Sequence, residues 1–259
     1  FSRHISIKNI KIEGAGKASG FTNNTAIKID HPWGIDHLTL ENLLIDGFAG
    51  HGIQTYQPLD DATHICFQFS EWSSIYIKNC TTGISLGYGF TGESQLNTIT
   101  TQFCDVGVDF TASTFAGAQG ITFTDGIFGF CGTGAKFSSG TAGMVNFNGC
   151  HFEGNTTNGV HFNNASIGQV NFNQTWFVNN PIGLQCTAGS SISFDSCTWQ
   201  TNGATTNKYI NVSSTSNFSI VLTGENKKIG TALTSDITAP DISIVTGAVL
   251  RSSATAGII

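Results

Sequence analysis

The stretch Val145-Asn146-Phe147-Asn148-Gly149-Cys150-His151-Phe152-Glu153-Gly154-Asn155 is one copy of a pattern that returns along most of this 259-residue chain. Its core is an apolar residue, a spacer, a second apolar residue, two polar or small residues, and then a residue that is usually Cys, Ile or Leu. A repeat of roughly 20 to 50 residues indicates a solenoid. Aligned on the first apolar residue, the copies start at Ile5, Leu38, Ile75, Ile99, Ile121, Val145, Val170, Ile192 and, less closely, Ile220.

A second pattern accompanies the first, a Gly followed by an apolar residue, a spacer and another apolar residue. Apolar and polar residues alternate only briefly before a Gly, Asn or Asp, which is typical of short strands that end at turns. No segment has a sustained helical period. We therefore predict an all-β fold, a single-stranded parallel β-helix of about eight to nine coils. The second pattern starts at Gly83, Gly107, Gly134, Gly159 and Gly183.

One position of the repeat is expected to stack inside the tube as a column of small side chains. The seven cysteines include no Cys-x-x-Cys pair with metal-ligand spacing, so we expect buried thiols and neither a metal nor a cofactor. The polar residues just before this position, such as Asn148 and Asn173, are expected to turn the corners. The column is predicted to hold Cys80, Cys104, Cys150 and Cys197, with Ile10, Leu43 and Ile127 in other copies.

The composition excludes two classes of partner. Charged residues make up 11% of the chain, against about 25% in an ordinary soluble domain, and the formal net charge is −6. Nucleic-acid binding is not expected, because no basic patch is available for phosphates. Membrane insertion is not expected either, because no run of about 18 apolar residues occurs.

The repeat, the Gly-led second strand and the Asn-rich corners resemble the pectin-lyase-like right-handed β-helices, especially the body of bacteriophage tailspikes. The resemblance covers roughly residues 1–222, expected to be the β-helix, whereas 223–259 break the pattern and are expected to be a C-terminal cap or oligomerisation segment. It implies a homotrimer in the virion tail or outside the cell, with a bacterial surface polysaccharide as partner. Hydrolases, lyases, epimerases and adhesins share this fold, so no catalytic residue carries over.

Insertions in the repeat mark where function is expected, because the coil itself does not need them. If corresponding corners stack, the segments 30–37, 56–64, 70–74 and 87–95 rise from one side of the first half of the tube. These segments carry aromatic and acidic residues together. The aromatic candidates for substrate binding are Trp33, Tyr56, Trp72 and Tyr88, and the catalytic candidates are Asp60, Asp61, Glu71 and Glu93.

Aromatic rings beside carboxylates suit sugar chemistry, since flat rings stack on sugar faces and two carboxyls act as acid and base or nucleophile. We therefore predict an endo-acting hydrolase of bacterial capsule or O-antigen. Carboxyls on adjacent or next-adjacent coils, about 4.8 or 9.6 Å apart, suit either retention or inversion of the anomeric centre.

Two alternatives stay open. The outward residues of the Gly-led strands form a row in which Asp109, Lys136 and His161 are neighbours. A polysaccharide lyase needs a base such as Lys or His and a cation that neutralises the substrate carboxylate. The simpler interpretation of this row is a surface ion pair between Asp109 and Lys136 beside an exposed His161. The other alternative is a non-catalytic glycan-binding adhesin or spike.

Overall fold

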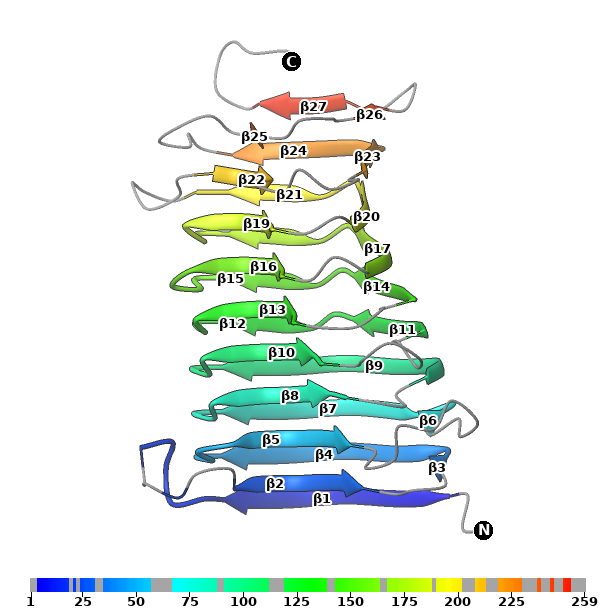
Figure 1. Cartoon of the computed structure of the whole chain (residues 1–259), viewed down its shortest axis with the longest axis vertical. Coiled ribbons are helices and arrows are strands. Elements are labelled where there is room, and N and C mark those ends of the chain that lie inside the picture. The colour runs from blue at the N-terminus through cyan, green and yellow to red at the C-terminus, as the bar shows by residue number, and fades with distance from the viewer. Residues whose placement is uncertain are drawn as a thin grey trace.

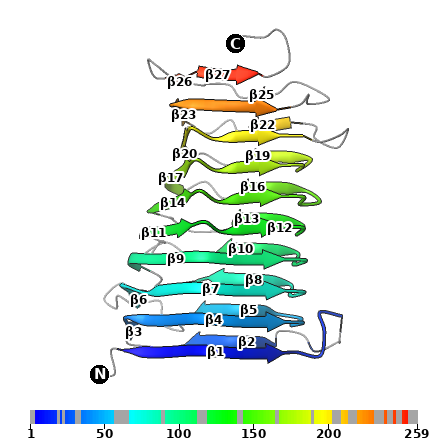
Figure 2. The ribbon, with the colours of Figure 1, turned by 180° about the vertical axis from the view of Figure 1, so that it is seen from behind.

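The computed structural model describes residues 4–18, 21, 24–30, 35–56, 67–87, 91–111, 119–138, 143–163, 167–187, 190–201, 208–212, 219–229, 237–238, 243–244 and 249–252. All regular structure in these ranges is β-strand. The strands are parallel and each pairs with its equivalent in the next coil, so the coils stack from the N-terminus to the C-terminus (Figures 1 and 2). The predicted fold class, a parallel β-helix, is confirmed.

Sixteen strands form one long sheet. Four early coils each contribute a single long strand, and later coils contribute two shorter ones. The single strands are β1 (Ile5–Glu13), β4 (Leu38–Asp46), β7 (Glu71–Lys78) and β9 (Thr91–Gln102). The shorter strands are β11 (Gln119–Thr124), β12 (Ile127–Gly129), β14 (Met144–Asn148), β15 (His151–Glu153), β17 (Ile167–Asn173), β18 (Trp176–Val178), β20 (Ser190–Asp195), β21 (Thr198–Gln200), β23 (Ser219–Thr223), β24 (Glu225–Ile229), β26 (Ser243–Ile244) and β27 (Val249–Ser252).

A nine-stranded sheet runs in the opposite direction on the other side of the tube (Figure 1). A two-stranded sheet of β3 (Ile35–Asp36) and β6 (Phe67–Gln68) precedes two of the long strands. The nine strands are β2 (Thr25–Asp30), β5 (His51–Tyr56), β8 (Thr82–Leu86), β10 (Val106–Phe110), β13 (Thr133–Phe137), β16 (Asn158–Phe162), β19 (Ile182–Cys186), β22 (Lys208–Val212) and β25 (Ile237–Thr238).

A residue in the left-handed region bends the long sheet near the middle of every coil whose bend lies in the described ranges. Short polar residues and Gly tolerate this conformation best, which explains why this position is polar or glycine in every coil that has it. The bend divides the long sheet into a first face before it and a second face after it; the nine-stranded sheet is the third face. The bend residues are Asn9, Asn42, Ser74, Thr98, Asp125, Gly149, Gln174, Ser196 and Gly224.

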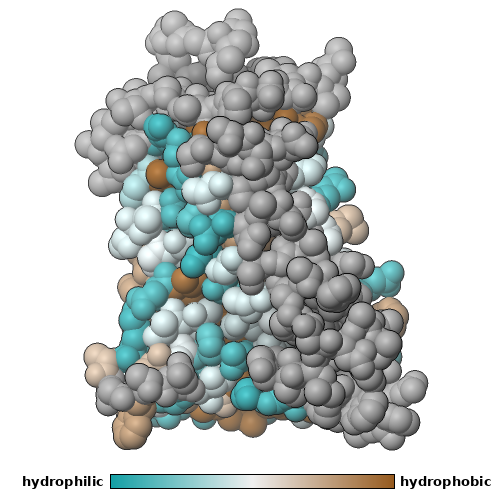
Figure 3. Space-filling view, viewed as in Figure 1, coloured by the Kyte–Doolittle hydropathy of each residue, from teal (hydrophilic) through white to brown (hydrophobic). Residues whose placement is uncertain are grey.

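The core of the tube is a set of aromatic and aliphatic columns. Inward residues of the first face stack on their equivalents, with ring centroids 5.1 Å apart for Phe123 and Phe147 and 5.2 Å apart for Phe147 and Phe172. These rings are fully buried. Between them the outward residues are mostly uncharged and polar, and the described surface in Figure 3 is mostly teal to white.

The Gly-led pattern has a steric cause. A Cβ on Gly107 would lie 2.4 Å from the carbonyl oxygen of Gly134 and 2.6 Å from the Oγ1 atom of Thr101 on the second face. No real Cβ approaches backbone so closely, so the second and third faces meet only where a side chain is missing.

The register differs from the predicted alignment in two early coils. Ile75 pairs with Leu43 and with Ile99, so both isoleucines lie on the second face. The equivalent of Ile121 in the preceding coil is Ser94. The prediction was wrong there because each early strand carries apolar residues on both sides of its bend, and the pattern matched the wrong half.

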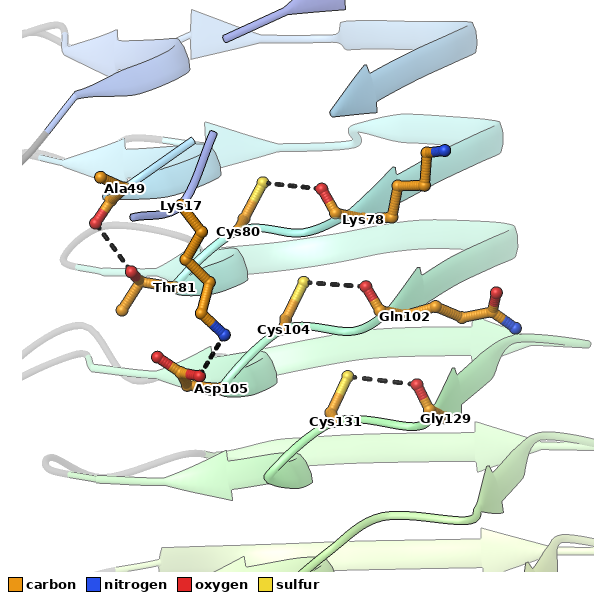
Figure 4. Close-up of polar contacts among 10 residues, drawn as sticks. All are labelled: Lys17, Ala49, Lys78, Cys80, Thr81, Gln102, Cys104, Asp105, Gly129 and Cys131. Atoms are coloured by element: carbon orange, nitrogen blue, oxygen red, sulfur yellow. Dashed lines mark hydrogen bonds and ion pairs between the residues drawn. The ribbon is translucent and has the colours of Figure 1, made fainter. Parts of the chain in front are cut away.

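The cysteines are buried as predicted, but they do not share one column. Cys80, Cys104 and Cys131 stack at the corner between the second and third faces, and each thiol donates to a carbonyl two residues earlier (Figure 4). Cys150 and Cys197 instead follow the mid-strand bend, where burial raises the pKa of each thiol to about 12.

One of the three aliphatic residues placed in that column also lies elsewhere. Ile127 is half-buried on the second face, opposite His151. Ile10 and Leu43 keep the predicted position directly after the bend, where they pair with each other, and Ile10 is 43% exposed because no described coil precedes it. The repeat therefore has two similar inward positions, one after the mid-strand bend and one at the corner between the second and third faces. The sequence pattern did not distinguish them.

The stack does not end at residue 222 as expected. Strand β24 pairs with β21, β25 with β22 and β27 with β24, all in parallel. The described strands after residue 222 thus add to the same sheets.

No described helix has the length and apolar character needed to cross a membrane.

Candidate functional site

A stack of exposed aromatic rings runs along the edge where the chain enters the first face. The rings of His4 and His37 have centroids 4.6 Å apart, and those of His37 and Phe69 are 5.5 Å apart. His4 and His37 directly precede strands β1 and β4, and Phe69 lies two residues before strand β7 of the next coil. The next residue in this column is Glu93. We call the column of His4, His37, Phe69 and Glu93 the starting edge.

The backbone at the starting edge is strained. His37 has φ 60° and Phe69 has φ 51°. A bulky residue in the left-handed region is an outlier that costs about 1–3 kcal/mol, and such residues cluster at functional sites. The Phe69 ring is nevertheless 45% exposed, so burial does not offset this cost.

Glu93 lies one coil beyond Phe69 in the same column. The Ser70 N–H donates to the Ser94 Oγ atom at 3.3 Å, and the Gln95 N–H donates to the Ser70 carbonyl at 2.9 Å. These bonds align the residues before them, Phe69 and Glu93.

Glu71 and Glu93 come together on this edge. Glu71 pairs with Gln95, two residues after Glu93, and all three side chains are exposed. With strands about 4.8 Å apart and about 3.3 Å per residue along them, the two Glu Cα atoms are diagonal neighbours about 8 Å apart. Long Glu side chains at this separation reach both the spacing of about 5–5.5 Å that suits retention and that of about 6.5–9.5 Å that suits inversion.

The other predicted site residues have different outcomes. Asp60, Asp61, Trp33 and Tyr88 lie outside the described residues, as does the side chain of Tyr56. The strands that precede these segments do end in register: Asp30 pairs with Tyr56, and Thr55 pairs with Leu86. Strands β2, β5 and β8 therefore end at the same edge of the third face.

The prediction for Trp72 was wrong. Segment 70–74 is not a loop, because Glu71 and Trp72 begin strand β7. The Trp72 side chain points inward and is 0% exposed, between Leu40 and Leu96 of the adjacent coils. Its ring belongs to the core and cannot stack on a sugar.

We call Asp109, Lys136 and His161 on the third face the acid–base row. This row has the predicted register but not the predicted exposure. Asp109 pairs with Lys136, and Lys136 with His161. One Asp109 carboxylate oxygen is buried without a hydrogen-bond partner, and burial raises the pKa of this carboxyl. His161 is half-buried, and burial together with Lys136 lowers the pKa of its ring.

The simpler interpretation of this row was therefore wrong. Among the ion pairs of the described residues none joins Asp109 to Lys136. The row instead presents an acid and a base whose pKa values are shifted toward each other from 3.8 and 6.5.

Asp109→Asn is expected to stabilise the protein at pH 7 but not at pH 3. The folded-state pKa of Asp109 lies above its unfolded value of 3.8, so the native state loses stability as pH rises through the raised pKa and the buried carboxyl ionises. The amide never ionises and avoids this loss. Thermal unfolding of parent and variant at both pH values measures the difference. A variant that loses equal stability at both would contradict the burial of the charge.

Among the described residues, no group of three or more His, Cys, Asp or Glu side chains is placed to hold a metal ion. No family model, no curated protein and no solved structure matches this chain.

Proposed function

We propose that this chain is an endo-acting glycoside hydrolase that cleaves a polysaccharide at the starting edge. One observation carries the proposal: Glu71 and Glu93 are exposed diagonal neighbours on adjacent strands, directly beside the stacked rings of His37 and Phe69. This combines the two carboxyls that glycosidic cleavage needs with an aromatic surface for a sugar ring.

In this reaction one glutamic acid protonates the glycosidic oxygen that leaves, and the other carboxylate activates water or attacks the sugar carbon. Phe69, whose ring is stacked on His37 through one face, holds the neighbouring sugar by its apolar face through the other. The resemblance to tailspike depolymerases adds a bacterial capsule or O-antigen as substrate, a homotrimer as the assembly, and the virion tail as the location.

The test is incubation of the protein with a panel of bacterial capsular and O-antigen polysaccharides. We expect new reducing ends and shorter chains with one of them, and no ultraviolet-absorbing product. Binding to a polysaccharide without cleavage across the whole panel would overturn the hydrolase and leave a glycan-binding spike.

The acid–base row favours a second candidate, a polysaccharide lyase. His161 stays neutral near pH 7 and takes the proton beside a uronate carboxylate, which Lys136 neutralises. Asp109, whose raised pKa keeps it protonated to higher pH than an exposed Asp, donates a proton to the leaving oxygen as the double bond forms. An unsaturated, ultraviolet-absorbing product that disappears in His161→Ala would identify this reaction.

A further inference from the structure

A ladder of side-chain amides and hydroxyls runs up the first face from the candidate site. Glu71 pairs with Gln95, and the same outward column continues coil by coil toward the C-terminus. A parallel column lies two residues further along each strand. We call these residues the amide ladder: Gln95, Thr122, Asn146, Asn171 and Ser193 in the first column, and Asn97, Thr124, Asn148 and Asn173 in the second.

Hydrogen bonds between coils hold the amide ladder in one orientation. Asn171 donates its Nδ2 to Asn146 Oδ1 at 2.8 Å, and Asn146 donates to Thr122 Oγ1 at 3.3 Å. In the second column Asn173 donates to Asn148 at 2.7 Å. Every donation points to the preceding coil, so the amides cannot rotate independently.

Each amide keeps hydrogen-bonding capacity for a ligand. A side-chain amide carries two N–H donors, and the ladder uses one of them on Asn146, Asn171 and Asn173. Among the ladder asparagines Asn97 is exposed, and the others are only partly buried. The first face therefore offers ordered donors at steps of about 4.8 Å along the tube.

We propose that the amide ladder binds the extended substrate chain along the tube axis and feeds it to Glu71 and Glu93. The inference rests on the proposed function for its catalytic end, but the binding it describes does not need cleavage. The first column, counted from Glu71 to Ser193, spans five steps from coil to coil, about 24 Å along the tube axis.

The chemistry of the ladder selects an uncharged, hydroxyl-rich stretch of polymer. None of its residues is Lys or Arg, so it has no cation with which to attract a uronate, a sulfate or a phosphate. Amide and hydroxyl groups match sugar hydroxyls, which both donate and accept. The ladder thus binds neutral sugars on the C-terminal side of the cleavage point.

The experiment compares Asn146→Ala and Asn171→Ala with a matched control, Asn211→Ala. Asn211 also donates its amide to the preceding coil, to Gln185 at 2.6 Å, but it lies on the third face. The probes are size-graded oligosaccharides made by partial acid hydrolysis of the panel polysaccharide that binds most tightly. We expect the ladder variants to weaken binding of the longest oligosaccharides about tenfold and to leave binding of the shortest unaffected, whereas Asn211→Ala binds both as the parent does.

Two further measurements keep the outcomes distinct. Asn171→Thr keeps a hydrogen-bonding group at this position, a hydroxyl like that of Thr122 in the same column. If this variant binds long oligosaccharides better than Asn171→Ala does, the Ala variant lost a contact with the ligand and not its fold. Equal affinity of the parent and both Ala variants for long oligosaccharides, while cleavage continues, overturns the ladder and leaves the hydrolase intact. Weaker binding in the ladder variants without cleavage by any form supports the ladder and overturns the hydrolase.

Discussion

Glu93→Gln is expected to lower the rate of glycan cleavage by about 10²–10⁴-fold, and Glu71→Gln by a similar factor. Each change removes a positioned acid, base or nucleophile, and losses of that order follow when such a group is deleted. The folded structure is expected to persist, because both side chains are exposed at the first face and neither forms an ion pair among the described residues. Release of reducing ends measures the effect.

The control for both changes is Glu153→Gln. Glu153 lies in β15 on the second face, away from the starting edge, so its loss leaves cleavage at the parental rate. If both glutamine variants at the starting edge cleave at the parental rate while Asp109→Asn or His161→Ala abolishes cleavage, the chemistry belongs to the third-face row.

Trp72→Ala is expected to lower the free energy of unfolding by about 3–5 kcal/mol, as removal of a large buried aromatic ring does. The cavity opens between Leu40 and Leu96, inward residues whose strands are fixed by pairing on both sides. Denaturant unfolding measures the loss.

Phe69→Ala provides the comparison three residues earlier. Its ring is exposed, and the backbone strain is unchanged because Ala keeps the Cβ atom that causes it, so we expect a stability change of less than about 1 kcal/mol together with weaker glycan binding. A Trp72 variant as stable as the parent would show that the first-face register is wrong.

The sequence could predict the fold because inward and outward residues alternate within a repeat of nearly constant length. It predicted the Gly-led strand for the same reason, and contact between Gly107 and the next coil explains why that Gly is needed. The register of the early coils could not be predicted. Ser70 and Ser94 fill inward positions there, and a buried Ser gives no apolar signal.

The candidate site was predicted only in part. Glu71 and Glu93 were chosen as residues of long loops, whereas they lie on adjacent strands, which fixes their separation more firmly than a loop could. The stack of His37 and Phe69 was missed because it depends on a left-handed backbone at both residues. Only Gly and Asn indicate that conformation in a sequence. Asn148 and Asn173 were taken as corner residues, and their bond across coils depends on the register.

Because each strand pairs only with its equivalents in the adjacent coils, unfolding can advance one coil at a time. Fraying from either end costs one interface per step, whereas opening in the middle breaks two. Amide protons of the central coils are therefore the last to exchange with solvent. The starting edge lies in the early coils, so its glutamates would lose their relative placement in a partly frayed tube whose C-terminal coils still held together.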